Sequence, residues 1–390
     1  MQNNKDIQIR DPFIFTNKRD GKYYMYGSTD KNIWSEGTGF DVYVGEDLNH
    51  WEGPYTVFKP NEDFYSEQQF WAPEVHEYNG NYYMFATFFR KDNNHRGTAI
   101  LRSDRLLGPF EPHSEGPVTP AEWHSLDGTF YRDEDGQPWM VFCHEWMQVG
   151  DGEICAMRLS EDLKEAVGKP IVLFRASEAP WPTPLELPPN FPNPELKSRE
   201  NFITDGTFMY KASNGELLML WASFVNNVYA QGISRSTSGV ITGPWVHDAA
   251  PIYNNDGGHA MIFRTFEENL MLTLHSPNIT PEERPIIIPM VEEDGNITLE
   301  QVSAVVRQDD ERDESEELTM TFDENSRLGD LLTNEAAAAV LEKHLPGISM
   351  NPTANMGKAF TLKQLVRIPQ ANLTDEKIME IAADLAGIER

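Results

Sequence analysis

A pair of short strand-like runs joined by a glycine turn recurs along this chain. Apolar and polar residues alternate over residues 9–15, Asp20-Gly21 forms the break, and an aromatic-rich run follows over residues 22–26. Alternation with a period of two, interrupted by a short glycine turn, is typical of a β-hairpin. Later copies of this unit begin at Trp71, Leu126, Thr204 and Gly258.

The spacing of the copies predicts the fold. Their turn residues lie 54 to 79 positions apart, at Gly21, Gly80, Gly136, Gly215 and Asn269. Strand repeats of this length are typical of propeller blades, so five units predict an all-β, five-bladed β-propeller over residues 1–308. A sandwich or a solenoid is the alternative. Strands nearest the axis start at the central cavity, which places five side chains around one funnel: Asp11, Glu74, Asp127, Asp205 and His259.

Two segments depart from the repeat. Residues 178–201 contain seven prolines, which cannot continue a strand ladder, and we expect a surface loop that shapes the rim of the pocket. Residues 309–327 are expected to form an acidic linker. A small helical module should follow over 328–390, with a helix over 335–341 capped by Thr333 or Asn334, a short helix over 360–365, and a helix over 375–386 capped by Thr374.

The charge balance excludes some partners. Asp and Glu number 62 against 32 Lys and Arg, a net charge of −30, and such a field repels nucleic acid and anionic membranes. No run approaches the length of a membrane span, and no apolar signal core precedes Ile7, which favours a cytoplasmic location unless a leader has been removed. Cys143 and Cys155 are expected to be free thiols. The oligomeric state stays open.

Carboxylates that begin axial strands suggest a reaction. Asp11, Asp127 and a third acid would meet in one cavity, where one ionised carboxylate activates water and a protonated one delivers its proton to a leaving oxygen. Asp-Pro and Asp-Gly steps also simply begin strands and turns. Three acids at matched repeat positions favour the chemical interpretation.

The motifs around these acids resemble glycoside hydrolase family 43, five-bladed propellers acting on arabinofuranosides and xylosides. Arg10-Asp11-Pro12 resembles the opening motif that holds the general base, and Leu126-Asp127-Gly128-Thr129 the segment with the pKa-modulating Asp. Trp71-Ala72-Pro73-Glu74 is similar to the Trp-Ala-Pro signature bordering the sugar site. Gly258-His259 matches a Gly-His near the axis, where the imidazole faces water or an ion, often calcium. The resemblance implies an inverting enzyme that requires no cofactor and acts on oligosaccharides, with a possible structural ion near His259.

The sequence leaves the general acid undecided. The family usually has Glu-Gly-Pro at the start of the fourth blade, where this chain has Thr204-Asp205-Gly206-Thr207. Blade register favours Asp205. Local similarity favours Glu178, in Glu178-Ala179-Pro180, although it lies twenty-seven residues earlier.

Further side chains are candidates for sugar binding. Aromatic rings can stack on the apolar face of a sugar, and polar groups at inner strand ends can face the pocket. These candidates are Trp71, Trp181, Glu74, His144, Arg264 and His275. Zinc-ligand spacings, phosphate loops and the nucleophile elbow of serine hydrolases do not occur in the sequence. Two rivals to the hydrolase remain, a non-catalytic carbohydrate-binding propeller and a propeller enzyme that acts as a glycoside phosphorylase.

Overall fold

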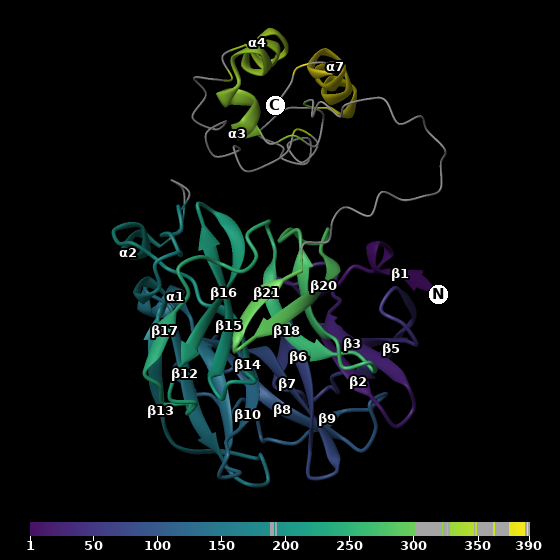
Figure 1. Ribbon diagram of the computed structural model, residues 1–390, viewed down its shortest axis with the longest axis vertical. Coiled ribbons are helices and arrows are strands. Elements are labelled where there is room, and N and C mark those ends of the chain that lie inside the picture. The colour runs from purple at the N-terminus through teal and green to yellow at the C-terminus, as the bar shows by residue number, and fades with distance from the viewer. Residues whose placement is uncertain are drawn as a thin grey trace. The chain divides into compact units, whose positions relative to one another are not determined.

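The computed structural model describes residues 1–187, 191, 193–300 and, from 322 to 388, residues 322, 326, 328–346, 348, 362, 374–386 and 388. These residues form two compact units, one within the first 300 residues and one from residue 322 onward. The first unit contains five antiparallel sheets, which follow one another along the chain (Figure 1). The five-bladed β-propeller predicted from the sequence is therefore confirmed.

The strands of each blade run in chain order from the axis outward. The first blade contains β2 (Arg10–Asn17), β3 (Lys22–Ser28), β4 (Phe40–Gly45) and β5 (His50–Phe58), and is extended by β1 (Gln2–Asn3). The second contains β6 (Ser66–Tyr78), β7 (Asn81–Arg90), β8 (Arg96–Ser103) and β9 (Glu111–Pro112). The third contains β10 (Ser125–Arg132), β11 (Pro138–His144), β12 (Glu153–Leu159) and β13 (Ala166–Arg175). The last two are β14 (Asp205–Lys211), β15 (Leu217–Val225), β16 (Val228–Ser236) and β17 (Trp245–His247); and β18 (Gly258–Arg264), β19 (Leu270–Ser276), β20 (Arg284–Glu293) and β21 (Asn296–Leu299).

The first strands of the five blades form a closed ring. Strand β2 contacts β6, β6 contacts β10, β10 contacts β14, β14 contacts β18, and β18 returns to β2. The last contact is a seam between the fifth blade and the first. Across it the Ile9 N–H donates to the Glu283 carbonyl at 3.3 Å, and the Thr16 hydroxyl donates to the Arg264 carbonyl at 2.7 Å. This closure brings the starts of all five strands to one axis.

Turn chemistry sets the register of several hairpins. In the turn between β6 and β7, Asn79 and Gly80 have φ of 47° and 76°, and in the turn between β20 and β21 Asp294 and Gly295 have 51° and 79°. Left-handed φ at both central positions defines a type I′ turn, whose twist matches that of the paired strands. The pairs Asn79-Gly80 and Asp294-Gly295 are therefore local causes of these two hairpins.

Every innermost strand carries an irregularity at the same place. In the first blade, the register of pairing with the second strand shifts between Arg10 and Phe13. Asp11, which directly follows the paired residue Arg10, has a left-handed backbone conformation. The same shift occurs in the other four blades. The left-handed residues are Asp11, Ala72, Asp127, Gly206 and His259, with φ between 47° and 57°. We call these five positions the bulge residues; the bulges turn the side chains at the strand starts toward the axis.

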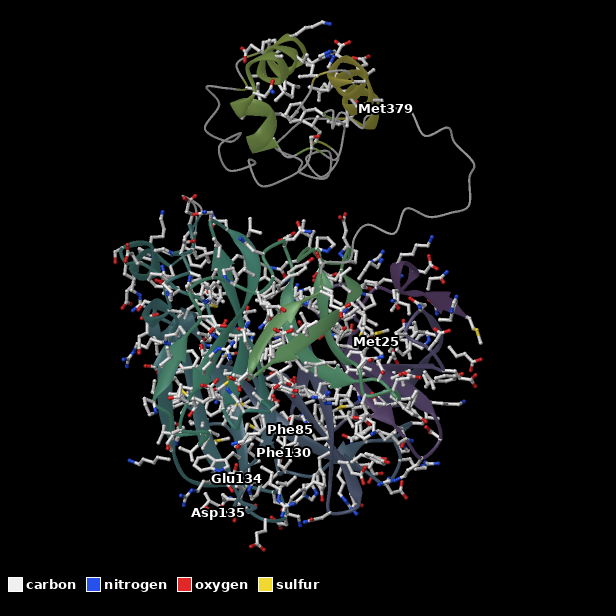
Figure 2. All side chains as sticks on the ribbon, viewed as in Figure 1. Met25, Phe85, Phe130, Glu134, Asp135 and Met379 are labelled. Carbon is white, nitrogen blue, oxygen red and sulfur yellow. The ribbon has the colours of Figure 1, made fainter. Side chains whose placement is uncertain are left out.

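Aromatic side chains pack between neighbouring blades. Phe85 of β7 and Phe130 of β10, labelled in Figure 2, have ring centroids 5.6 Å apart and join the second blade to the third. His76 contacts both rings, at 5.7 and 5.6 Å. Such interlocking apolar surfaces hold the inner strands rigidly, because buried side chains pack at crystal-like density. The site at the axis is built on this frame.

The proline-rich segment lies between β13 and β14. A 3-10 turn η2 (Ala176–Glu178) opens it, and a short helix α2 (Pro194–Lys197) is capped by Asn193, whose side-chain oxygen accepts from the N–H groups of Glu195 and Leu196. Residues 188–190 and 192 lie outside the described residues. A second short helix, α1 (Trp146–Val149), follows β11.

The C-terminal unit has its own hydrophobic core. It contains α3 (Leu328–Thr333), α4 (Glu335–His344) and α7 (Asp375–Leu385). Asn334, one of the two caps expected, caps α4, and Thr374 caps α7 as expected. Leu331, Leu341 and Ile381 are fully buried among these helices. Most of the expected acidic linker at 309–327 and most of the expected helix at 360–365 lie outside the described residues. Among the described helices, none is both long and apolar enough to cross a membrane.

Candidate active site

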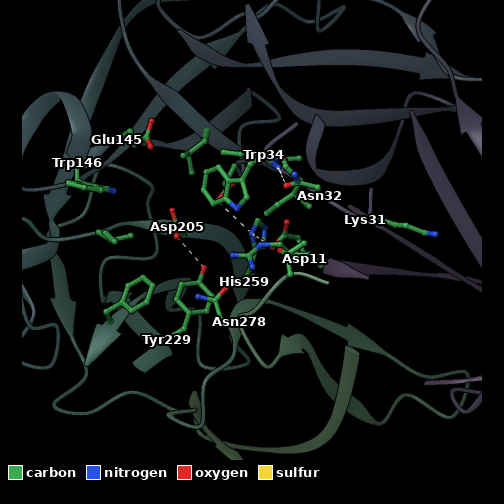
Figure 3. A pocket seen from close by; sticks show the side chains of 18 residues that line it. Asp11, Lys31, Asn32, Trp34, Glu145, Trp146, Asp205, Tyr229, His259 and Asn278 are labelled. Carbon is green, nitrogen blue, oxygen red and sulfur yellow. Dashed lines mark hydrogen bonds and ion pairs between the residues drawn. The ribbon is translucent and has the colours of Figure 1, made fainter. Parts of the chain in front are cut away.

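A pocket of about 580 Å³ opens where the inner strands begin (Figure 3). Its wall includes the bulge residues of three blades, Asp11, Asp127 and His259. Asp205 also lines it, but from the position before the bulge residue of its own blade. The closed ring thus gathers residues that are up to 248 positions apart in the sequence.

Asp11 is buried and held by contacts from two blades. Its N–H donates to Nδ1 of His275 at 3.2 Å, and its Oδ2 accepts from the Ser28 hydroxyl at 3.1 Å. Its Oδ1 lies 3.2 Å from Nδ1 of His259 and 3.7 Å from Nε of Arg10. Contacts on both oxygens fix the orientation of this carboxylate at the pocket wall, as a base that orients a water molecule requires.

Asp127 faces the same nitrogen of His259 as Asp11 does. Its Oδ2 is 3.5 Å from Nδ1 of His259 and accepts from the Gly206 N–H at 2.8 Å. Its own N–H donates to the Thr87 hydroxyl at 2.9 Å. His259 therefore bridges two carboxylates, and the contact with Gly206 connects Asp127 to the strand that carries Asp205.

These contacts separate the protonation states of the three groups. Burial disfavours the charge on each of them, but the two carboxylates outweigh burial at His259 and raise its pKa to about 10. Burial opposes ionisation of Asp11, yet the imidazolium and Arg10 hold its pKa well below the usual range. For Asp127 burial prevails, and its pKa rises to about 6. Asp11 is thus an anion at neutral pH, paired with a cationic His259.

Asp205 has the opposite electrostatic setting. Burial and the nearby charge of Asp127 raise its pKa to about 7. Its Oδ2 lies 3.4 Å from the hydroxyl of Tyr229, a contact drawn in Figure 3. A large fraction of Asp205 is therefore protonated near neutral pH, while Asp11 is not. Two carboxyl groups with separated pKa values in one pocket are the arrangement from which general acids and bases are assigned.

Glu178 does not join this group. It is exposed at the end of η2, where its Oε1 accepts from the Arg175 N–H at 3.0 Å, and it does not line the pocket. The carboxylate closes the first turn of a 3-10 helix. The structure therefore favours Asp205 over Glu178 as the candidate acid.

Two members of the Trp71–Glu74 motif have different surroundings. Trp71 lines the pocket, and its indole N–H donates to the Ile33 carbonyl at 2.6 Å. Glu74 lies three positions beyond Trp71, two past the bulge residue Ala72, and its Oε2 contacts Nε2 of His76 at 2.9 Å. Glu74 was expected at a position equivalent to Asp11, but the register places it further along the strand and off the pocket wall.

The remaining candidates lie at varying distance from the pocket. His275 is fully buried behind Asp11, and burial lowers its pKa to about 3, so the ring is neutral and its Nδ1 can accept the Asp11 N–H. His144 stacks on Trp123 at 4.0 Å, and Arg264 donates to the Tyr210 hydroxyl at 2.8 Å on the outer end of β18. Trp181 packs in the core against Trp221. None of these four residues lines the pocket.

A protonated His259 Nδ1 cannot be a metal ligand. The nitrogen faces both Asp11 and Asp127, and a ring with a pKa of about 10 carries a proton that a metal ligand would have to lose. In the described part of the chain, no group of three or more His, Cys, Asp or Glu side chains could hold a metal ion. The imidazolium itself supplies the positive charge between the carboxylates, and no step below passes through a metal ion.

Several residues of the pocket were not predicted as site residues. Trp34, 60% exposed, stands edge-on to Trp71 with ring centroids 5.0 Å apart. Glu145 and Trp146 enter from the end of β11, and Tyr229 from the third strand of its blade. Loops after second strands and positions on third strands have no repeat marker, so the sequence pattern could not locate them.

Comparisons with known proteins give a consistent result. The model of the glycosyl hydrolases family 43 matches residues 6–296. A probable arabinan endo-1,5-alpha-L-arabinosidase A of Emericella nidulans is 21% identical over 151 residues, which are 36% of this chain and 44% of that protein. Xylosidase/arabinosidase 43A of Humicola insolens is 29% identical over 140 residues, 33% of this chain and 41% of that protein. These matches span less than half the length of either relative.

Solved structures match over most of the propeller. An endo-arabinase from Bacteroides thetaiotaomicron is 39% identical with a TM-score of 0.69, and the match covers 76% of this chain and 98% of that one. A thermostable family-43 glycoside hydrolase is 21% identical with a TM-score of 0.62, over 77% of this chain and 96% of that one, which supports the fold alone.

Proposed function

Because the chain belongs to the glycosyl hydrolases of family 43, we propose that this glycosidase hydrolyses α-L-arabinofuranosidic bonds in oligosaccharides by an inverting, single-displacement reaction. The observation that carries the proposal is that two carboxyl groups line one pocket, Asp11 with its pKa held low by His259 and Arg10, and Asp205 with its pKa raised to about 7 by burial. An inverting glycosidase requires these two states on opposite sides of the sugar.

In the proposed reaction Asp11 is the general base. It accepts a proton from a water molecule as the oxygen attacks the anomeric carbon, and the pair with His259 keeps it ionised until then. Asp205 donates its proton to the departing glycosidic oxygen, so the bond to the leaving sugar breaks as the bond to water forms. Asp127 holds the Gly206 N–H and places negative charge beside Asp205.

The arabinofuranosidic bond is supported by the endo-arabinase from Bacteroides thetaiotaomicron, which is the most similar of the solved structures described above. A β-D-xylosidic bond is the second candidate, favoured by the Humicola insolens relative, whose name covers both activities. Assays with 4-nitrophenyl α-L-arabinofuranoside, 4-nitrophenyl β-D-xyloside, α-1,5-arabino-oligosaccharides and xylo-oligosaccharides compare the two.

The test also separates an enzyme from its rivals. Sugar release that disappears in Asp11→Asn supports hydrolysis by this site. Binding of arabino-oligosaccharides without release would favour a non-catalytic propeller, and turnover that requires phosphate would favour a phosphorylase.

A further inference from the structure

Glu145 is a buried carboxylate on the pocket wall that the acid–base scheme does not use. It follows β11 and precedes α1, and its N–H donates to the His124 carbonyl at 2.8 Å. Its side chain is about 8% exposed, yet it lines the pocket together with Trp146 (Figure 3). A buried charge needs a partner, and its surroundings show how this one is satisfied.

One oxygen of Glu145 is fixed by a cation. Oε2 accepts from Nη1 of Arg96 at 2.6 Å. The guanidinium is fixed in turn, since its Nε donates to Oε1 of Gln69 at 2.8 Å and its plane lies over the Trp71 ring at 4.6 Å. Burial lowers the pKa of His124 to about 4, so that ring, 3.8 Å from the same oxygen, adds no second positive charge.

The other oxygen is available to a ligand. Within the described residues, every side-chain contact of Glu145 passes through Oε2, and Oε1 is not one of the buried polar atoms without a partner. Oε1 therefore reaches the solvent of the pocket. Because the contact of Oε2 with Arg96 fixes the orientation of the carboxylate, Oε1 is a strong acceptor for a sugar hydroxyl.

The position of Glu145 indicates which sugar it meets. Its negative charge is one of the causes of the raised pKa of Asp205, so the two groups are close. Figure 3 shows Asp205 between Asp11 and the pair Glu145–Trp146. Asp205 would protonate the departing oxygen, so the leaving sugar lies on the side of Asp205 that faces away from Asp11.

We propose that Glu145 accepts a hydrogen bond from a free hydroxyl of the leaving sugar through Oε1, with the half-buried Trp146 as the apolar wall of that subsite. This inference rests on the proposed function. Its substrate class is an oligosaccharide whose leaving group is an unsubstituted sugar. An aromatic leaving group, which has no such hydroxyl, does not use the subsite.

The test compares Glu145→Gln with the wild type on two substrates, α-1,5-arabinotriose and 4-nitrophenyl α-L-arabinofuranoside. Glu153→Gln is the matched control: Glu153 is also buried and paired with an arginine, Arg175 at 2.9 Å, but does not line the pocket. We expect Glu145→Gln to lower kcat/KM for arabinotriose about tenfold, mainly through a higher KM. For the aryl substrate, kcat/KM should change less than about threefold.

The outcomes separate the two proposals. If Glu145→Gln lowers kcat/KM equally for both substrates, or for neither, the subsite is overturned while the hydrolase assignment stands. If Glu153→Gln reproduces the selective loss, the effect is structural and the subsite is likewise overturned. A folded wild-type protein that cleaves neither compound overturns the proposed function and the subsite with it.

Discussion

Asp11 and Asp205 reach the same pocket from different positions of their bulges. Asp11 is the left-handed residue of its inner strand, whereas Asp205 is the residue before the left-handed Gly206. This offset of one position gives the two carboxylates different neighbours. Asp11 contacts the His259 imidazolium, while Asp205 faces Tyr229 and the charge of Asp127. Their separated pKa values follow from this offset.

The first prediction concerns the proton donor. Asp205→Asn should lower kcat/KM for arabino-oligosaccharides by a factor of about 10²–10⁴, because proton transfer to the leaving oxygen is lost. A 2,4-dinitrophenyl arabinofuranoside should be affected far less, since its leaving group departs without a proton. Steady-state kinetics on both substrates are the measurement. Glu178→Gln is the control and should stay within about twofold of the wild type; a large loss in that variant would restore Glu178 as the donor.

The pH dependence follows from the same residue. In the proposed mechanism Asp205 donates a proton, so kcat/KM should fall as the pH rises through about 7. The pKa of Asp11 lies well below its usual range, so protonation of the base should not limit activity above pH 4. A pH–rate profile of the wild type checks both limbs. A rate that stays constant from pH 6 to 9 would exclude Asp205 as the acid.

The stereochemical outcome is a third prediction. Direct attack by water inverts the anomeric centre, so proton NMR recorded within the first minutes should show the β-anomer as the first product of an α-arabinofuranoside. Asp11→Asn should abolish hydrolysis of every substrate, whatever its leaving group. An α-anomer as first product would show a covalent intermediate and contradict the assigned role of Asp11.

A fourth prediction tests the charge of His259. The pKa of His259 is raised to about 10, so its protonation stabilises the folded protein. This stabilisation is fully present below the ordinary histidine pKa of 6.5 and is lost as the pH rises through about 10. The difference in Tm between wild type and His259→Gln should therefore be larger at pH 6 than at pH 10. Removal of metal ions with EDTA should change neither Tm nor activity. A Tm that drops on chelation and recovers with calcium would show an ion that this account omits.

Gly206 offers a fifth prediction with a matched control. A Cβ at this position would lie 2.6 Å from Cα of His259, on a backbone with φ of +57°. We expect Gly206→Ala to cost about 1–3 kcal/mol in the free energy of unfolding and to lower activity. At Gly215, with φ of +91°, a Cβ meets no atom within 4 Å, so Gly215→Ala tests the backbone strain alone. Equal losses in Tm would refute the steric argument.

The fold was predictable because its signals are local and repeated. Hairpin turns such as Asn79-Gly80 and the alternation of strands such as residues 9–15 are each legible within ten residues, and their spacing gives the blade count. Asp11, Asp127 and Asp205 could be singled out because they lie at strand starts. The sequence could not show that Glu74 and Asp11 occupy different positions on their strands, since a bulge shifts the register by a residue without changing the hydrophobic pattern.

The rest of the pocket wall depends on tertiary packing. Glu145 is a binding candidate only because Arg96, from another blade, fixes one of its oxygens. Trp181 appeared suited to sugar stacking, yet its ring fills the space over Gly232 beside Trp221. Whether an aromatic ring faces a pocket or a core depends on the neighbouring blade, and the local sequence has no record of that neighbour.

Asp11, the proposed base, lies at the seam that closes the ring. Asp11 lies in the first inner strand and takes its backbone contact from His275, in the last blade. If the first and fifth blades separated briefly, Asp11 would lose its contacts with His275 and His259 while the other four junctions stay intact. The placement of Asp11 therefore depends on how the two ends of the propeller chain meet.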